Sequence, residues 1–264
     1  MQACITLDLE PDHVGRVPTL EYVGWEPARV DELLRLLERF RAPLTVFVVA
    51  KALAAQPATV EAFRASGAEL QLHSHSHDLA NPDSLDEVRR GCEAFERALG
   101  RRPEGYRAPE GRISDAGWER LDAEGFLYDS SIFPSFWPRP RYIRFRPEPF
   151  RPAGRRLLEL PISTLSPLRL IVSLSWFKLL GWPVYRRLLG AGTLPEPLVF
   201  DMHLHDLWHL PASDGLGQPW RLIYSRNRDG GLRMLASFLE MLVLRGYRFT
   251  TLGAVARERQ AAEC

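Results

Sequence analysis

Apolar residues in this chain fall into short continuous runs that alternate with helical stripes. Residues 44–49 form such a run, which suits a strand buried on both faces of a parallel sheet. In residues 27–40 the apolar side chains recur every three or four positions, as in an amphipathic helix. The pattern predicts strands over 3–9, 44–49, 68–72, 126–129, 157–160, 198–203 and 247–250, and helices over 27–40, 57–66, 84–99, 114–124 and 232–245.

Local signals support the ends of several of these helices. Ser84 and Glu87 have the spacing of a capping box at the start of the third helix. Gly67, Gly100 and Gly125 follow three of the predicted helices, where glycine commonly ends a helix in a left-handed conformation.

Strands and helices therefore alternate along most of the chain. This order predicts an α/β fold, a parallel sheet or barrel whose strands are joined by helical crossovers. Such folds place their functional residues at the carboxyl ends of the strands. With no internal repeat and no convincing linker, we expect residues 1–264 to form one catalytic domain.

Three histidines follow the predicted strand 68–72. His73 and His77 are four residues apart, so one helical turn or a tight loop would direct both rings to one place. Neutral imidazole is the commonest protein ligand of zinc and its neighbours, so the pair indicates a metal site. His75 lies between them in the sequence. On strand-like spacing its side chain would point away from the metal and contact the ligands only from outside. A solvated histidine-rich loop is the alternative.

Two acids stand at the end of the first predicted strand. Asp8 lies on the face opposite to Ile5 and Leu7, and Glu10 follows on the same side as Asp8. Two carboxylates at a buried strand end repel each other unless a cation lies between them. Taken alone, the stretch also fits a strand that simply enters a polar turn at Pro11.

Three later segments carry polar groups at predicted strand ends or turns. Arg107 lies in a Gly-Tyr-Arg-Ala-Pro stretch, and Asp129 closes the strand 126–129. The strand 198–203 ends in a stretch that contains His203 and His205. In chain order the motifs are Asp8-x-Glu10, His73-Ser-x-x-His77, Arg107-x-Pro109-x-Gly111, Tyr128-Asp-Ser-Ser131 and Leu204-His-Asp206.

Together these five motifs resemble the polysaccharide deacetylase family (carbohydrate esterase family 4), and in particular its intracellular exopolysaccharide-associated branch. The resemblance covers residues 6–205, and five ordered motifs are far more specific than any one of them. It implies a distorted (β/α) barrel with about seven parallel strands. It also implies a metal-dependent hydrolase that removes an N-acetyl group from an amido sugar of a polysaccharide or its precursor.

The motifs can be given roles in that reaction. We expect Glu10, His73 and His77 to hold one divalent ion, with a position left open for water and substrate. Asp8 would be the general base, and His205 would protonate the departing amine. Two alternatives stay open: Asp12 could replace Glu10 as the metal carboxylate, and His203 could replace His205 as the acid.

The resemblance also implies supporting residues. Arg107 would orient and tune Asp8 through an ion pair, and Asp129 would help anchor Arg107 or His205. Two imidazoles and one carboxylate suit zinc first, with cobalt, nickel, iron or manganese as alternatives. The same groups would serve a deformylase, a cyclic amidase or an O-acetyl esterase. A catalytically silent carbohydrate-binding module would be expected to lack the base or a ligand.

Composition narrows the surroundings in which the protein acts. The net charge of +1 and the lack of a basic stripe argue against nucleic acid as a partner. Cys4, Cys92 and Cys264 are widely spaced, which predicts reduced thiols in a reducing compartment. No targeting segment precedes the first predicted strand, so we expect a cytoplasmic protein.

Residues 167–189 do not fit the plain alternation of strands and helices. The segment is rich in leucine and aromatic residues with arginines at intervals, and is too short and too charged to span a bilayer. A barrel helix is the interpretation that we favour, and peripheral contact with the inner face of a membrane is the alternative. That alternative suits a lipid-linked or nucleotide-linked sugar precursor as partner. The oligomeric state is left open.

Overall fold

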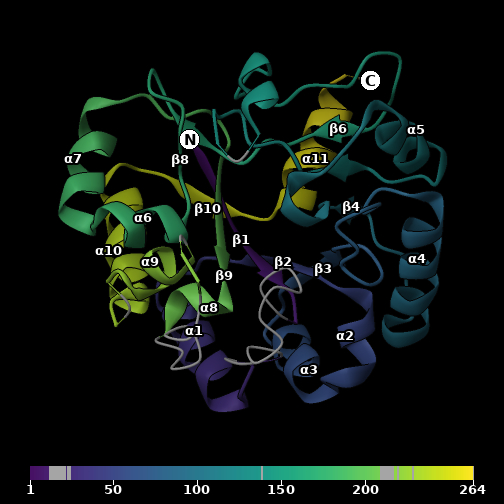
Figure 1. Cartoon of the computed structure of the whole chain (residues 1–264), viewed down its shortest axis with the longest axis horizontal. Helices are drawn as coiled ribbons and strands as arrows, with labels where there is room; N and C mark the ends of the chain where they lie inside the picture. Colours follow the sequence, from purple (N-terminus) through teal and green to yellow (C-terminus); the bar gives the residue numbers. More distant parts are fainter. Residues whose placement is uncertain are drawn as a thin grey trace.

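The computed structural model describes residues 1–11, 22, 25–137, 139–208, 217–218, 220–227 and 229–263. Strands surround the centre of the molecule and helices pack outside them (Figure 1). The described strands are β1 (Gln2–Leu9), β2 (Leu44–Val48), β3 (Glu69–Leu72), β4 (Gly105–Tyr106), β5 (Tyr128–Asp129), β6 (Leu158–Glu159), β7 (Thr164–Leu165), β8 (Leu170–Ile171), β9 (Leu198–His203) and β10 (Arg248–Thr250). The described helices are α1 (Pro27–Arg39), α2 (Ala50–Ala55), α3 (Pro57–Ala65), α4 (Leu85–Leu99), α5 (Asp115–Ala123), α6 (Leu174–Leu180), α7 (Trp182–Ala191), α8 (Leu204–Leu207), α9 (Trp220–Ser225), α10 (Gly231–Leu244) and α11 (Leu252–Ala262), with 3-10 helices η2 (Pro109–Gly111) and η3 (Pro140–Arg144).

The main sheet is parallel throughout and strongly curved. Its order is β9-β1-β2-β3-β4-β5-β6, seven strands side by side within the described part of the chain. β10 pairs with residues 2–4 of β1, and β2 pairs with residues 5–9 of β1. Both strands therefore lie along the edge of β1 opposite to β9. The expected distorted barrel of about seven parallel strands is confirmed.

The two faces of this sheet have different neighbours. Ile5 and Leu7 belong to the larger apolar cluster, which also contains the buried faces of the outer helices. Cys4 belongs to a second cluster inside the barrel, together with Phe47 and Tyr128. Since side chains alternate along a strand, Asp8 shares the inner face with Cys4. The facing predicted for the first strand is therefore correct.

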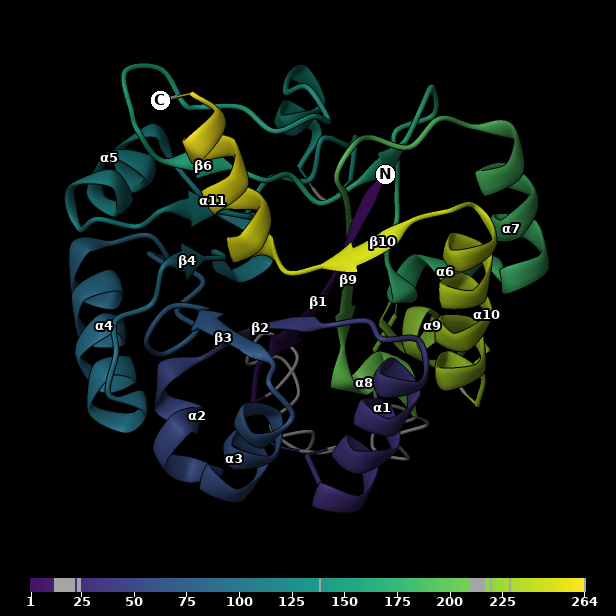
Figure 2. The ribbon, with the colours of Figure 1, turned by 180° about the vertical axis from the view of Figure 1, so that it is seen from behind.

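α11 closes one end of the barrel. Its Leu252 and Val255 are buried in the inner cluster, and the Leu252 N–H donates to the Thr45 hydroxyl (3.1 Å). Figure 2 shows α11 lying across the strands, on the side away from the viewer of Figure 1. The periodicity analysis predicted nothing beyond residue 250. With this end closed, the carboxyl ends of the strands are the open side of the barrel.

Within residues 167–189, β8 is followed by the helices α6 and α7, so the segment is mostly helical, as favoured from the sequence. Phe177 of α6 is fully buried, and its ring packs against those of Tyr185, Phe200 and Phe238. Trp182 packs on Phe177 and Phe238 as well. Burying one large apolar side chain stabilises a fold by about 1.5–3 kcal/mol, which explains why these aromatics face inward. Phe177 is thus buried inside the fold, whereas Trp182 is only partly buried, and contact of this segment with a membrane stays a prediction. Among the described residues, no helix is long and apolar enough to cross a bilayer.

Candidate active site

The carboxyl ends of four strands bring the predicted site residues together. Asp8 and Glu10 end β1, and His73 directly follows β3. Arg107 directly follows β4, and His203 is the last residue of β9. All of them lie at the end of the barrel opposite to α11, as expected for a parallel sheet.

A tight loop, and not a helix, carries the two histidines. Ser74 and His77 both have left-handed backbone conformations, with φ of 60° and 62°. The Ser74 hydroxyl accepts a hydrogen bond from the His77 N–H (3.1 Å), which closes the loop on itself. The rings of His73 and His77 lie 5.2 Å apart between centroids. Non-glycine residues adopt this conformation at a cost, which is common at functional sites.

The backbone fixes the tautomer of His73. Its Nδ1 lies 2.7 Å from the carbonyl oxygen of Arg107. A carbonyl oxygen only accepts, so Nδ1 carries the proton and the lone pair is on Nε2. The second ring nitrogen of a metal-binding histidine is commonly held in this way.

Glu10, His73 and His77 fit a divalent ion. The Glu10 Oε2 atom lies 2.8 Å from His77 Nε2 and 3.8 Å from His73 Nε2, and the three ligand atoms lie within 4.8 Å of one another. Ligands of a tetrahedral zinc ion, each about 2.0–2.1 Å from it, are roughly 3.3 Å apart. Although burial raises the pKa of Glu10, the charges of His77 and His203 lower it well below its usual value. Asp12, the alternative ligand, lies outside the described residues.

Arg107 is the centre of a buried network beside these residues. Its side chain is 1% exposed and its Nη1 donates to Asp8 Oδ1 and Asp201 Oδ1, each at 2.8 Å. Its guanidinium lies over the Phe47 ring, 4.3 Å from the centroid. Burial raises the pKa of Asp201 to about 7, and the charge of Asp8 acts in the same direction. Removing one partner of such a buried ion pair costs roughly 3–5 kcal/mol.

Ser130, and not Asp129, anchors Arg107. The Ser130 carbonyl accepts from Arg107 Nε (2.9 Å), and its hydroxyl bonds to Nη2 (3.0 Å). Asp129 points to the outer face of the sheet, where its carboxylate accepts from Trp118 Nε1 and the Ser131 hydroxyl. The expected role for Asp129 as anchor of Arg107 or His205 is therefore corrected, because alternation along β5 turns the neighbouring serine inward.

His203 lies closer to the predicted base than the sequence analysis assumed. Its Nε2 is 3.9 Å from Asp8 Oδ2 and 3.8 Å from Glu10 Oε1. The ring of His205 stacks on that of His203, with centroids 4.7 Å apart. His203 is the last inward-facing residue of β9, whereas His205 already belongs to α8. The geometry thus favours His203 over His205 as the acid.

The other ring nitrogen of His203, Nδ1, faces Asp206. Asp206 Oδ2 lies 3.4 Å from His203 Nδ1 and accepts from the His203 N–H at 3.1 Å. Ser175 of α6 bonds to both oxygens of Asp206, at 2.9 and 2.8 Å. Lys178, 2% exposed, directs its ammonium to the carbonyl of His205 (3.5 Å). Burial lowers the pKa of Lys178, and the charge of Asp206 raises it.

Glu87 is a further residue that the sequence analysis misread. Ser84 caps α4 as predicted, but the Glu87 side chain does not complete the capping box. Its carboxylate instead accepts from the backbone N–H of His75 (3.2 Å) and of Ser76 (2.8 Å), and from the Ser76 hydroxyl (2.7 Å). His75 therefore faces α4, behind the ligands, as expected. Glu87 holds the backbone between the two metal-ligand candidates.

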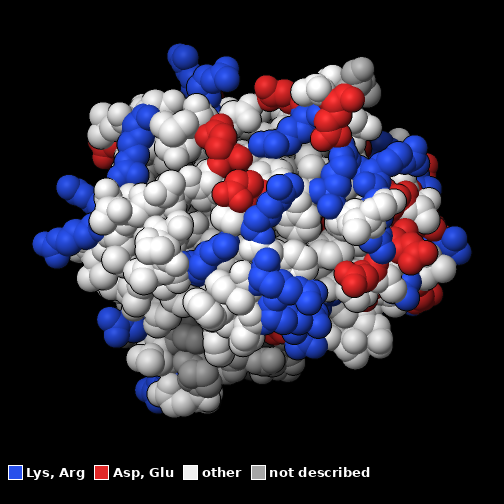
Figure 3. All heavy atoms as spheres, turned by 90° about the horizontal axis from the view of Figure 1, so that it is seen from above, with Lys and Arg blue, Asp and Glu red and all other residues white. Residues whose placement is uncertain are grey.

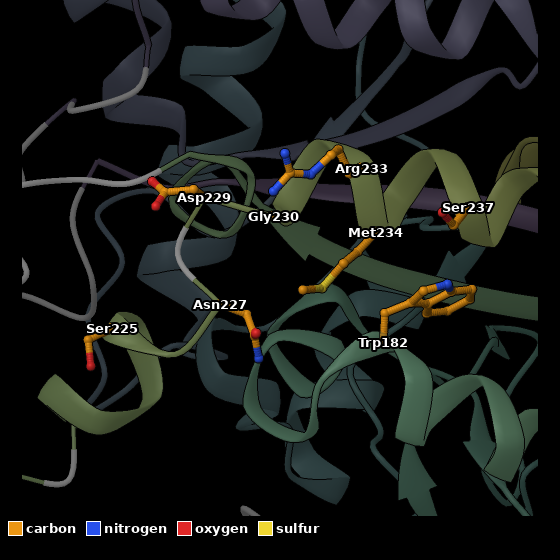
Figure 4. Close-up of a pocket in the computed structure, with 8 residues that line it drawn as sticks. All are labelled: Trp182, Ser225, Asn227, Asp229, Gly230, Arg233, Met234 and Ser237. Carbon is orange, nitrogen blue, oxygen red and sulfur yellow. The ribbon is translucent and has the colours of Figure 1, made fainter.

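A separate pocket lies beside α7 and α10. Figure 4 shows Trp182 and Met234 lining it, with Asp229 and Arg233 near its other end. None of the residues in the strand-end cluster lines this pocket. It offers no set of imidazoles and carboxylates, so the strand-end cluster is the better candidate for chemistry.

Comparison with known proteins supports the fold and the motifs. A model of the polysaccharide deacetylase family matches residues 17–128. A peptidoglycan deacetylase-like protein, FGM2, of Gibberella zeae is 32% identical over 109 residues, which are 39% of this chain and 32% of that protein. The match thus spans about a third of the length of this relative.

Solved structures resemble the chain over nearly its whole length. A putative polysaccharide deacetylase from Mycobacterium smegmatis has a TM-score of 0.64 at 19% identity and covers 99% of this chain and 91% of its own. A probable polysaccharide deacetylase from Pseudomonas aeruginosa PAO1 has a TM-score of 0.64 at 20% identity, with 97% and 89% covered. An allantoinase, PuuE, has a TM-score of 0.63 at 19% identity, with 98% and 90% covered. At these identities, the structures show a shared fold.

Proposed function

We propose that this chain, whose residues 17–128 match the polysaccharide deacetylase family, belongs to that family and hydrolyses the N-acetyl group of an amido sugar, in a polysaccharide or its precursor. One observation carries the proposal: two carboxylates and three imidazoles converge at one end of the barrel. They belong to Asp8, Glu10, His73, His77 and His203. His73 and His203 lie on either side of Asp8, each with Nε2 3.9 Å from its Oδ2.

Glu10, His73 and His77 would hold a divalent ion, with zinc as the first choice for this donor set. When bound, such an ion would supply Lewis acidity and make water a better nucleophile at neutral pH. The Arg107 carbonyl would keep His73 in the tautomer that ligation requires.

Asp8 acts as the general base in this proposal. Its Oδ1 is held by Arg107, while its Oδ2 faces His73 and His203. One oxygen is thus fixed and the other is directed toward the place where water would attack the acetamide carbonyl. There it accepts the proton that the water loses as the new carbon–oxygen bond forms.

His203 acts as the general acid. Burial lowers the pKa of His203, but the charge of Glu10 and the hydrogen bond to Asp206 raise it well above its usual value. The hydrogen bond to Asp206 would thus favour the protonated form of His203, which an acid in this role requires. It donates that proton to the nitrogen of the breaking carbon–nitrogen bond, so that acetate and a free amine leave.

The assignment is tested by comparing three variants for acetate release and bound metal. Asp8→Asn and His203→Gln should each lower turnover by roughly 10²–10⁴-fold with the metal retained, because a positioned acid or base contributes that much. His205→Gln is the matched control and should retain most activity. If His205→Gln were the inactive variant and His203→Gln the active one, the acid would be His205.

Metal dependence has its own test. Dialysis against a chelator should abolish acetate release, and added Zn²⁺ or Co²⁺ should restore it. His73→Ala should lose both metal and activity, since it removes one of three protein ligands. Full activity in the chelated protein would contradict the proposed metal.

The amido sugar could be presented to the enzyme in more than one chemical form. A nucleotide-linked or lipid-linked amido sugar in the cytoplasm is our first candidate for the precursor. The fold shared with an allantoinase gives a reason to assay a cyclic amide beside the amido sugars. Faster turnover of the cyclic amide would favour that second activity.

A further inference from the structure

A group of cationic and aromatic side chains lies at the rim of the site, on the segments that follow β4 and β5. We call Arg112, Phe136, Trp137, Arg139 and Arg141 the rim cluster. Arg112 follows η2 directly, Phe136, Trp137 and Arg139 lie between the end of β5 and η3, and Arg141 lies in η3. Both segments begin at the strand ends that carry Arg107 and Ser130, so the cluster lies on the open side of the barrel.

Hydrogen bonds connect the rim cluster to the histidine loop. Arg112 Nη1 donates to the carbonyl of Leu79 (2.7 Å), two residues after His77. Arg139 Nε donates to the carbonyl of Glu110 in η2 (3.3 Å). Tyr142 of η3 donates to the Gly111 carbonyl (2.7 Å). The two segments are therefore fixed on each other and on the loop that carries His77.

Positive charge is concentrated here. Residues 139–156 contain seven arginines and a single acidic residue, although the whole chain has a net charge of only +1. Burial lowers the pKa of Arg139, and the charges of Arg112 and Arg141 lower it further. Among the described residues, Glu110 pairs with both Arg112 and Arg139. Figure 3 shows one large face of the molecule on which Lys and Arg gather in several places.

Arg141 in particular is exposed without a carboxylate partner in the described part of the chain. Its guanidinium lies over the Tyr142 ring, 5.0 Å from the centroid, and donates to the Tyr142 hydroxyl (3.3 Å). Arg144 lies one 3-10 turn further and covers the Phe145 ring at 5.0 Å. Side chains three apart in a 3-10 helix lie on one side, so two like charges are held together there. An anion beside them would relieve this repulsion.

Two adjacent aromatic residues precede these arginines by a few positions in the sequence. Phe136 is 63% exposed and Trp137 is 57% exposed, although large aromatics are usually buried on average. Their exposed rings offer flat apolar surfaces, and amphipathic ligands bury apolar faces on such rings. A sugar ring has an apolar face of carbon-bound hydrogens and polar edges, which matches this pairing.

We propose that the rim cluster binds an acidic glycan, a chain whose sugars carry carboxylate or phosphate groups beside the amido sugar. Trp137 and Phe136 would cover sugar faces, and Arg141 and Arg139 would pair with the acidic groups. This inference rests on the proposed function and specifies its substrate class. A glycan is favoured over a membrane because the cluster is hydrogen-bonded, through Arg112, to the segment that carries His77.

The test uses two amido-sugar oligomers of equal length, one neutral and one with carboxylates on neighbouring sugars. Wild-type kcat/KM should be higher for the acidic oligomer, and added salt should remove the difference. Arg141→Ala should lower kcat/KM for the acidic oligomer by roughly threefold to fivefold, the scale of one exposed charge pair, and leave the neutral one unchanged. Trp137→Ala should weaken both. Arg186→Ala, an exposed arginine of α7, is the matched control and should change neither.

Direct binding separates this inference from the proposed function. Calorimetry should show the acidic oligomer binding more tightly than the neutral one, and Arg141→Ala should remove the difference. If this pattern holds and no acetate is released from either oligomer, the rim inference stands and the deacetylase proposal fails. If acetate is released equally fast from both and both bind equally, the inference is overturned. Binding to anionic lipid vesicles that depends on Trp137, without any preference between oligomers, would also overturn it in favour of a membrane.

Discussion

At the scale of single residues, the acid side of the site depends on a carboxylate that the motifs did not identify as a partner. Asp206 bonds to both the backbone and the ring of His203. Its own charge is stabilised by the Ser175 hydroxyl and by the nearby Lys178. Burial raises the pKa of Asp206, but the hydrogen bond to His203 and the charges of His205, His203 and Lys178 lower it below its usual value. In the proposed mechanism Asp206 would therefore position His203 and favour its protonated form.

Replacing this carboxylate should shift the pH profile of catalysis. With His203 as the acid, activity should fall on the alkaline side as His203 loses its proton, and Asp206 is one of the groups that raise the pKa of His203. In Asp206→Asn the charge is gone, so the alkaline fall of kcat should move to lower pH. Ser175→Ala keeps the charge and serves as the control, with a smaller shift. An unchanged alkaline limb in Asp206→Asn would contradict this coupling.

Most of the site residues could be predicted from the sequence because they stand at strand ends in motifs of fixed spacing. Two features could not. Asp201 lies within an apolar strand, and only the curvature of the sheet brings it to Arg107 across β1. The choice between His203 and His205 depends on where β9 ends, and strand boundaries are the least certain part of a pattern-based prediction.

At the scale of elements, α4 supports the metal-ligand loop from outside the barrel. Glu87 is 6% exposed and accepts three hydrogen bonds from residues between His73 and His77. The loop contains two left-handed non-glycine residues, so it needs such external support to keep its shape. From the sequence, the spacing of Ser84 and Glu87 predicted a capping box. The spacing alone does not show whether Glu87 bonds to the backbone at the start of α4 or, as observed, to the backbone of His75 and Ser76.

Neutralising Glu87 should therefore weaken metal binding more than it weakens the fold. In Glu87→Gln one of the two acceptor oxygens becomes an N–H donor and the negative charge is lost, so the hydrogen bonds to the loop are weakened and the Ser76 hydroxyl must reverse its role. We expect the affinity for Zn²⁺ to fall by roughly 10–100-fold, as for other residues that hold metal ligands in place. Metal titration with a competing chelator measures this. Glu93→Gln, on the exposed side of α4, is the control, and equal affinities in both variants would exclude the supporting role.

At the scale of the whole molecule, the alternation of strands and helices was sufficient to predict a parallel barrel, and the order of motifs was sufficient to predict its open end. The helix α11 was not predicted from the sequence, because its apolar residues do not form a clear amphipathic stripe. The few that are buried fill one end of the barrel interior. The predicted strands 126–129 and 157–160 were too long. In the structure, only two residues of β5 form pairs with two residues of β6.

The same pair of strands contains an acidic pair that should make the stability of the whole protein depend on pH. Asp129 and Glu159 are paired in the register of β5 and β6, and both are fully buried on the outer face. Burial and then the charge of Asp129 raise the pKa of Glu159 well above its usual value, and burial raises the pKa of Asp129. The folded protein thus binds more protons than the unfolded chain, whose glutamates have a pKa of about 4.3.

The free energy of unfolding should accordingly fall as the pH rises above the unfolded-state pKa of about 4.3, because deprotonation is easier in the unfolded chain. Glu159→Gln keeps an oxygen for the Ile132 N–H, which now bonds to Glu159 Oε1 at 2.9 Å, and removes the titrating group. We expect this variant to be more stable than the wild type at about pH 8, with the difference shrinking toward pH 5. Urea midpoints across that range measure the effect, and the exposed Glu148→Gln should follow the wild type. Parallel curves for Glu159→Gln and the wild type would mean that Glu159 is already ionised in the folded protein, with its charge compensated inside the sheet.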